Sequence, residues 1–127
     1  MAALKPMMFR AETAPPPPGP PTSGMDRHQL AEREGTWIGL VRTDPGFAGG
    51  WHHHGDRESW IYQIRGKMTV EFGAGGAESI TAHPGDVIVV PPHAIHREIT
   101  PGESAEAIVV RIGSGPQNFN VDGPDEP

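Results

Sequence analysis

Glycine and proline interrupt this chain so often that the apolar segments between residues 36 and 112 are only five to eight residues long. Segments of that length suit β-strands, whereas helices of globular proteins average about 11 residues. Eight segments are rich in β-branched or aromatic residues, and they cover residues 36–43, 49–54, 59–64, 67–72, 78–82, 86–90, 94–100 and 105–112. Because Gly- and Pro-bearing turns separate them, the sequence predicts an all-β sandwich or barrel.

The two ends of the chain differ from this central part in composition. Residues 1–25 hold seven of the fifteen prolines and show no apolar periodicity, which predicts a disordered or polyproline arm. The arm is either a docking peptide or a dispensable tail. Another alternative is that translation starts at Met25. Residues 26–113 are the predicted barrel, and its polar beginning, up to residue 35, is expected to give at most a short helical turn or a lead-in strand. Residues 114–127 predict an irregular C-terminal tail.

The charge and composition of the chain narrow the classes of partner and site. The net charge is -6 and the basic residues are scattered, which argues against a nucleic-acid partner. Because the chain has no cysteine, any metal must be held by histidine, aspartate or glutamate. No apolar run approaches the length of a membrane span, and the first residues lack a signal-peptide pattern. We therefore expect a soluble, cytoplasmic protein with no membrane partner.

Six of the seven histidines lie between residues 52 and 96. Side chains alternate between the two faces of a strand, so His52 and His54 can share one face while His53 points away. His96, from a distant segment, is the best candidate for a third nitrogen ligand. Three imidazoles suit one divalent transition metal, namely Fe, Ni, Mn, Zn or Cu, and leave positions for water or substrate. A low-complexity metal tract is the alternative, but this run is internal and only three residues long.

Two motifs carry a resemblance to a known family. Gly46 is followed by five residues and then by the histidines 52–54, and Gly85 is followed by five residues, then by Pro91, and later by His96. This pattern resembles the two motifs of the cupins, which are jelly-roll barrels also called double-stranded β-helices. The short span between the motifs is typical of the small single-domain bacterial type. The resemblance implies a metal bound in the mouth of the barrel.

The resemblance also implies a glutamate ligand, whose position is ambiguous here. Ser59 lies at the four-residue spacing from His54 and leaves six residues before Gly66, whereas Glu58 fits the three-residue spacing but leaves seven. On an undistorted strand Ser59 shares a face with Gln63, and a β-bulge would be needed to turn Glu58 inward. A three-histidine site is therefore favoured, with Glu58 as an optional fourth ligand.

Four further residues are candidates for the substrate pocket. If His96 points inward, Glu98 does too, and it then needs a partner, which is a metal-bound water, the free N–H of a ligand histidine, a substrate hydroxyl or a cross-strand arginine. Gln63 either binds substrate or pairs with a neighbouring backbone. His93 either lines the pocket mouth or is a solvated turn residue. Tyr62 is a candidate general acid, although its register favours the outside of the barrel.

The chemistry that the resemblance implies is broad. Small cupins include dioxygenases, isomerases, lyases and decarboxylases. The first hypothesis is a dioxygenase or related oxidoreductase acting on a small chelating organic substrate. The alternatives are a non-catalytic ligand-binding or sensing barrel and a metal-dependent isomerase or lyase. Because both faces of the segment 59–64 carry apolar residues, we also expect a homodimer.

Overall fold

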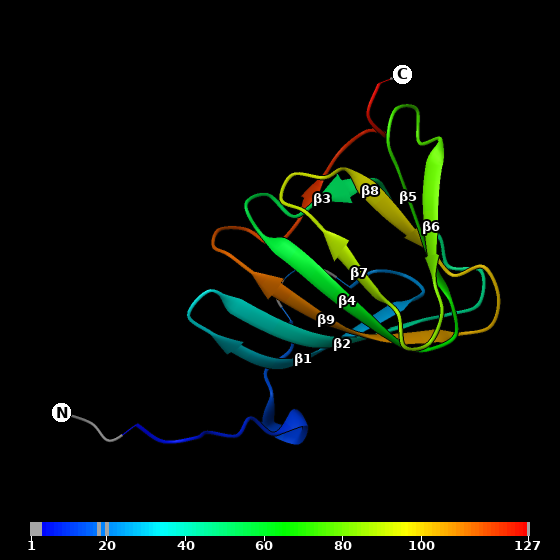
Figure 1. Ribbon diagram of the computed structural model, residues 1–127. Helices are drawn as coiled ribbons and strands as arrows, with labels where there is room; N and C mark the ends of the chain where they lie inside the picture. The colour runs from blue at the N-terminus through cyan, green and yellow to red at the C-terminus, as the bar shows by residue number, and fades with distance from the viewer. Residues whose placement is uncertain (1–3, 18, 20, 127) are drawn as a thin grey trace.

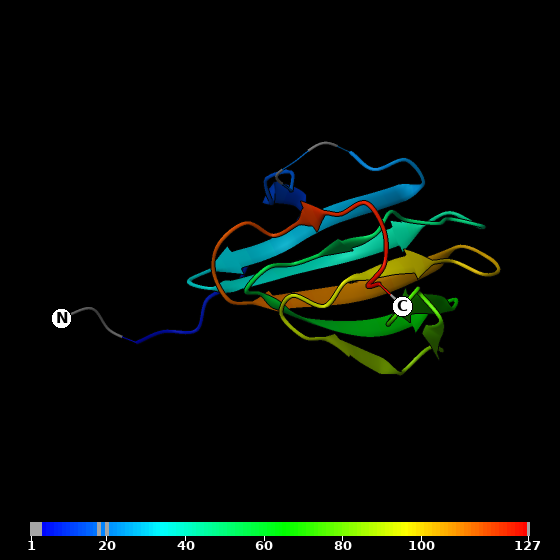
Figure 2. The ribbon, with the colours of Figure 1, turned by 90° about the horizontal axis from the view of Figure 1, so that it is seen from above.

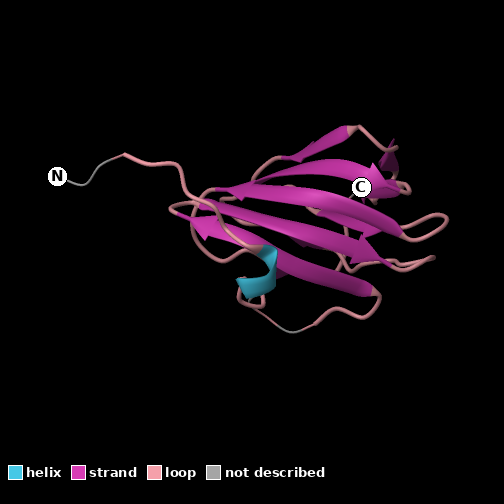
Figure 3. Cartoon of the chain, turned by 90° about the horizontal axis from the view of Figure 1, so that it is seen from below, coloured by secondary structure: helices cyan, strands magenta, loops and turns pink. Residues whose placement is uncertain are grey.

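The computed structural model describes residues 4–17, 19 and 21–126, which form two antiparallel β-sheets packed against each other (Figure 1). The first sheet has the order β1 (Met25–Arg33), β2 (Thr36–Thr43), β9 (Ala105–Ile112), β4 (Glu58–Arg65) and β7 (Val87–Val90). The second has the order β10 (Phe119–Asn120), β3 (His52–His53), β8 (His96–Ile99), β5 (Met68–Phe72) and β6 (Glu78–Ala82). A single 3-10 turn, η1 (Ala11–Thr13), lies beside the strands (Figure 3).

The path of the chain between the two sheets defines the architecture. From β3 to β10 the chain crosses to the other sheet at every step except the β5–β6 hairpin. This winding is that of a double-stranded β-helix, and the view from above shows the long strands of the first sheet side by side (Figure 2). The all-β, jelly-roll prediction is therefore confirmed. No helix among the described residues is long and apolar enough to span a membrane.

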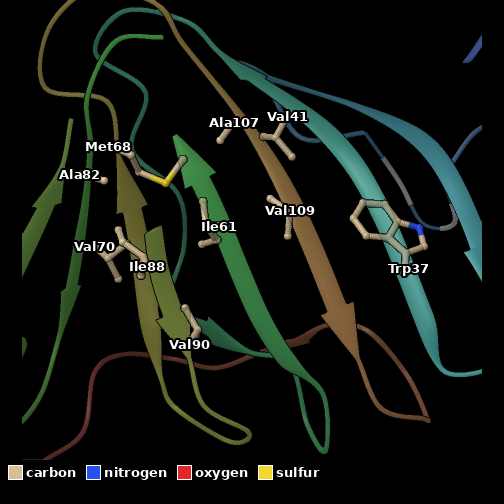
Figure 4. Packing of buried hydrophobic residues seen from close by; sticks show 10 residues of the cluster. All are labelled: Trp37, Val41, Ile61, Met68, Val70, Ala82, Ile88, Val90, Ala107 and Val109. Carbon is tan, nitrogen blue, oxygen red and sulfur yellow. The ribbon is translucent and has the colours of Figure 1, made fainter. Parts of the chain in front are cut away.

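The core between the sheets follows from strand alternation. On β2, and on β4 and β9 except in their last residues, every second residue is buried, so each strand presents one row of side chains to the interior. Ten buried residues pack together in the core (Figure 4): Trp37, Val41, Ile61, Met68, Val70, Ala82, Ile88, Val90, Ala107 and Val109. Burial of each large aliphatic side chain stabilises the fold by about 1.5–3 kcal/mol.

Most predicted strands agree with the structure, and the start of the barrel differs from the prediction in length. Of the two expectations, a short helical turn or a lead-in strand, the strand is found, but β1 has nine residues and pairs along the whole of β2. Gln29 explains the difference, because its side chain is buried and its Oε1 accepts a hydrogen bond of 2.9 Å from Trp37 Nε1. The polar Gln29 thus occupies an inward position of β1. The segment therefore lacks the alternation of apolar residues by which a strand is predicted. The predicted strand 49–54 is reduced to the two residues of β3.

Both chain ends contact the barrel. Residues 1–3, 18, 20 and 127 lie outside the described residues. In the described part of the N-terminal arm, Ala11 O accepts a hydrogen bond of 3.0 Å from His28 Nε2. The backbone of Thr22 pairs with that of Met25 in an isolated antiparallel β-bridge. The C-terminal tail, expected to be irregular, contains β10, which pairs with β3. Both ends therefore make specific contacts with the strands.

Candidate metal centre

Three histidines and one glutamate converge between the sheets. Within the described part of the chain, one group of side chains could hold a metal ion, and it comprises His52, His54, His96 and Glu98. Their candidate ligand atoms all lie within 4.8 Å of one another. His52 and His96 lie directly opposite each other on β3 and β8. His54 and Glu98 each lie two residues further along, and the two-residue period of a strand keeps a side chain on the same face.

Backbone carbonyls fix the orientation of all three imidazole rings. The Nδ1 atoms of His52, His54 and His96 bond to the carbonyl oxygens of Gly50, Gln117 and Ala94, at 2.8, 2.7 and 2.8 Å. A carbonyl oxygen can only accept, so each Nδ1 carries a proton and each neutral ring keeps a lone pair on Nε2. Metal-ligating histidines almost always have such a partner for the second nitrogen. The three rings are therefore held in the tautomer that binds a metal.

Glu98 lies among the three Nε2 atoms. Its Oε1 is 3.1 Å from His96 Nε2, its Oε2 is 3.5 Å from His52 Nε2, and its side chain is 12% exposed. Burial raises the pKa of Glu98, but the hydrogen bonds to His52 and His96 outweigh it and hold the pKa well below its usual range. The carboxylate is therefore ionised. Such short contacts between a carboxylate and ring nitrogens need a proton or a metal cation between them.

The surroundings of His52 and His54 shift the pKa values of the two rings in opposite directions. Burial lowers the pKa of His52, but the hydrogen bond and charge of Glu98 outweigh it, so that the pKa is raised. Burial, together with the charge of Arg111, lowers the pKa of His54 to about 3. His54 is therefore neutral, and available as a ligand, throughout the physiological range. The set of three imidazole nitrogens and one carboxylate fits a divalent transition metal.

Glu58, the optional fourth ligand, does not reach this cluster. Its Oε2 accepts a hydrogen bond of 2.9 Å from Trp60 Nε1 on the outer face of β4. The bulge that would turn Glu58 inward would lie between His54 and Glu58, but there the chain makes a turn in which Arg57 N donates to His54 O at 3.1 Å, and Glu58 begins β4 in its outward row. Ser59 takes the inward position instead and is buried. The carboxylate at the cluster is Glu98, which the sequence placed in the pocket and not among the ligands.

The other three pocket candidates lie away from the cluster. Gln63 is fully buried, and its Nε2 donates to Arg65 O and Gly66 O, at 3.0 and 3.3 Å, so it supports the turn after β4. Tyr62 is 49% exposed on the outer face. His93 has a positive φ of 64° in an exposed turn, and its Nε2 lies 2.8 Å from an oxygen of Asp56. Each of the three therefore follows the alternative that the sequence left open: Gln63 pairs with neighbouring backbone, Tyr62 lies outside the barrel, and His93 is an exposed turn residue.

A cavity of about 410 Å³ adjoins the cluster. His52, His54 and Glu98 border it, as do two residues that sequence reasoning missed, Arg27 and Arg111. The sequence does contain a pattern that places Arg111 inward. In the segment 105–112 alternate residues are small or apolar, and they are buried up to position 109. The next residue in this inward row is Arg111, a charge where a core residue is expected.

The C-terminal tail crosses the same region, where the red segment passes β3 (Figure 1). Gln117 contacts two groups of the site, because its backbone oxygen accepts from His54 and its Oε1 accepts a bond of 3.1 Å from Arg111 Nη1. Phe119 stacks on His53 with the ring centroids 5.0 Å apart, so His53 faces away from the cluster as expected. Val121 N donates to Trp51 O at 3.0 Å. The tail thus orients one candidate ligand and one cavity residue.

Comparisons with known proteins agree with this architecture. A family model described as the cupin domain matches residues 39–112, which is more than half of the chain. A search of curated proteins gave no match.

Two solved structures show the likeness in the fold. KdgF from Halomonas sp. is 21% identical, with a TM-score of 0.70, and the match covers 86% of this chain and 96% of that chain. The polyketide cyclase RemF from Streptomyces resistomycificus is 21% identical, with a TM-score of 0.68, covering 83% of this chain and 76% of that one. At these identities the likeness shows the fold alone.

Proposed function

Because this chain belongs to the cupin domain family, we propose that it is a metal-dependent enzyme acting on a small chelating organic substrate. In this proposal His52, His54, His96 and Glu98 hold one divalent transition metal beside the cavity. The observation that carries it is the convergence of three Nε2 atoms and a carboxylate, with every Nδ1 already bonded to a backbone carbonyl. Rings held in this way need little rearrangement to bind a metal.

The residues around the cavity favour chemistry in which negative charge develops on the substrate. A divalent metal in this site supplies Lewis-acid polarisation of a substrate oxygen. Arg27 and Arg111 border the same cavity, and fixed cations stabilise an enolate-like transition state. Val41, Phe47 and Met68 give the cavity an apolar wall that limits access of water. These features support an isomerase, lyase or cyclase reaction.

A dioxygenase or related oxidoreductase is the second candidate function. The donor set favours it equally, because three imidazoles and a carboxylate would also hold iron, nickel, manganese or copper, which would supply oxygen-activating chemistry. The dependence of turnover on oxygen therefore decides between the two candidates.

The test is metal analysis followed by assays of the metal-loaded protein. We expect about one metal per chain, and consumption of small diketones or other enolisable carbonyl compounds without oxygen. Oxygen uptake with diketones, flavonols or catechols would favour the dioxygenase. A bound metal with no turnover would favour a ligand-binding or sensing barrel, and purified protein that binds none of the five metals would refute the metal site.

A further inference from the structure

Two polar side chains that the metal cluster does not use lie side by side in the cavity wall. Ser59 on β4 and Arg111 on β9 are directly opposite each other in the strand pairing. Both border the cavity that also contacts His52, His54 and Glu98. Ser59 Oγ and Arg111 Nε are buried, and neither atom has a hydrogen-bond partner within the described structure. Two adjacent donors are therefore unsatisfied beside the metal cluster.

The guanidinium of Arg111 is held in position by its neighbours. Its Nη1 donates to Gln117 Oε1 at 3.1 Å, and its Cζ lies 5.0 Å from the centroid of the Trp37 ring. The Trp37 ring lies across Gly39, where a Cβ atom would collide with it, and Trp37 Nε1 is bonded to Gln29. A guanidinium held in this way loses little freedom when it binds an anion.

Charge in the cavity wall favours an anionic ligand. Within the described residues Arg111 forms no ion pair with a carboxylate at 4.0 Å or less. Burial lowers the pKa of Arg111 to about 10, which leaves the guanidinium charged at neutral pH. Arg27 adds a second positive charge to the same wall. The carboxylate of Glu98 in the same wall raises the pKa of Arg111 but lies beyond ion-pair distance, so the buried Nε keeps a free N–H for a ligand anion.

We infer that Arg111 and Ser59 form a carboxylate subsite, so that the ligand is a small hydroxy- or oxo-carboxylic acid. Its hydroxyl or carbonyl oxygen faces the histidine cluster, and its carboxylate accepts hydrogen bonds from Arg111 Nε and Ser59 Oγ. A guanidinium suits a carboxylate because its donors match the two oxygens in one plane. The inference rests on the proposed metal site and adds the substrate class to it.

The test is calorimetric titration of the zinc-loaded full chain with two matched series of ligands. One series is glycolate, 3-hydroxypropanoate and 4-hydroxybutanoate, and the other is the corresponding neutral amides. We expect the best acid to bind at least about 10-fold more tightly than its amide, since bonds to charged groups are the stronger ones. The preference should disappear in Arg111→Met, shrink in Ser59→Ala, and persist in the control Arg42→Met, an exposed arginine paired with Glu106.

Different failures separate the inference from the proposed function. If zinc binds but acids and amides bind equally, or if Arg111→Met keeps the preference, the subsite is refuted while the metal site stands. If the wild-type chain takes up neither zinc nor any of the other four metals, the proposed function itself fails. Circular dichroism and zinc content check that each variant is folded. Ser59→Ala leaves the charge in place, so it still tests the subsite if Arg111→Met does not fold.

Discussion

Glu58 and Glu98 each lie close to a histidine in the sequence, but they end up in different environments. Glu98 follows His96 by two residues on β8, so both point into the barrel and the carboxylate reaches two Nε2 atoms. Glu58 begins β4 in the row that faces outward, where it bonds to Trp60. The difference teaches that the face of the strand, and not the spacing from a histidine, selects the carboxylate. Substitutions of inner and outer side chains should therefore differ in their effect on the metal.

The largest effect is expected from the inner histidines. His52→Ala, His54→Ala or His96→Ala should each lower metal affinity by more than about 100-fold, because loss of a ligand exceeds the effect of losing a supporting group. His53→Ala, which removes an outward ring, is the matched control and should keep the affinity. Metal content after dialysis, with circular dichroism as a check of folding, measures the effect. Full metal content in all three variants would contradict the site.

The two glutamates provide the next test. Glu98→Gln should lower metal affinity by about 10- to 100-fold, because the amide keeps the shape but loses the charge. Glu58→Gln should leave the affinity unchanged. Competition with a chelator of known affinity measures both variants. If Glu58→Gln has the larger effect, β4 must rearrange when the metal binds, and the contrast drawn from the strand faces is wrong.

Removal of the C-terminal tail should have a smaller effect on the metal. A chain that ends at Gly113 lacks the Gln117 carbonyl that orients His54, so its metal affinity should fall by about 10-fold. Removal of residues 1–10, which do not border the cavity, is the control and should leave the affinity unchanged. Equal affinities of both truncated chains and the full chain would show that the tail does not orient the ligand.

In the metal-free protein, the His52–Glu98 pair predicts a pH dependence of stability. The pKa of His52 is raised from 6.5, so its contribution is full below pH 6.5 and is lost as the pH rises through the folded value. The pKa of Glu98 is lowered from 4.5, so its contribution is present above pH 4.5 and is lost as the pH falls through the folded value. The pair should therefore stabilise the fold most between pH 4.5 and 6.5.

Thermal unfolding in the presence of a chelator measures this pH dependence. The pKa of His54 is lowered to about 3, so this ring gives the opposite trend and destabilises the fold as the pH falls through 6.5. The pair is therefore measured as the difference in Tm between the wild-type protein and Glu98→Gln, which should be a few degrees between pH 4.5 and 6.5 and shrink above neutral pH. A difference that grows from pH 6 to pH 8 would contradict the predicted pair.

Substitutions on the outer face of β4 and β7 should have the least effect on metal binding. Trp60, Tyr62 and Val87 are exposed there, at 43%, 49% and 53%. We propose that this face joins two copies of the chain, because an apolar patch of this kind often marks an interface. Light scattering should give the mass of a dimer, and Trp60→Glu should give a monomer with unchanged metal content. A monomeric wild-type protein would refute the interface.

Strand periodicity made the fold and the histidine cluster predictable. The bounds of β2, β6 and β9 agree with the segments 36–43, 78–82 and 105–112. The parity of residues 52–54 likewise assigns two rings to one face and one to the other. These features depend on local alternation, which a single sequence displays.

The features that the sequence did not predict depend on contacts between distant segments. The Gln117 carbonyl bonds to His54 although the two residues are 63 positions apart in the sequence, and no local pattern predicts this contact. The use of Glu98 in place of Glu58 depends on how β3 and β8 pair. Arg111 is an intermediate case, since alternation along β9 does place it inward, but its role follows from the cavity and not from its own segment.

The central claim is that one metal binds between His52, His54, His96 and Glu98. Anomalous diffraction from crystals of the metal-loaded protein, recorded at the absorption edge of the metal, tests it most directly. We predict one peak per chain at about 2.0–2.2 Å from the three Nε2 atoms and from a Glu98 oxygen. A peak bound through Nδ1, a peak beside Glu58, or no peak between β3 and β8 would contradict the account.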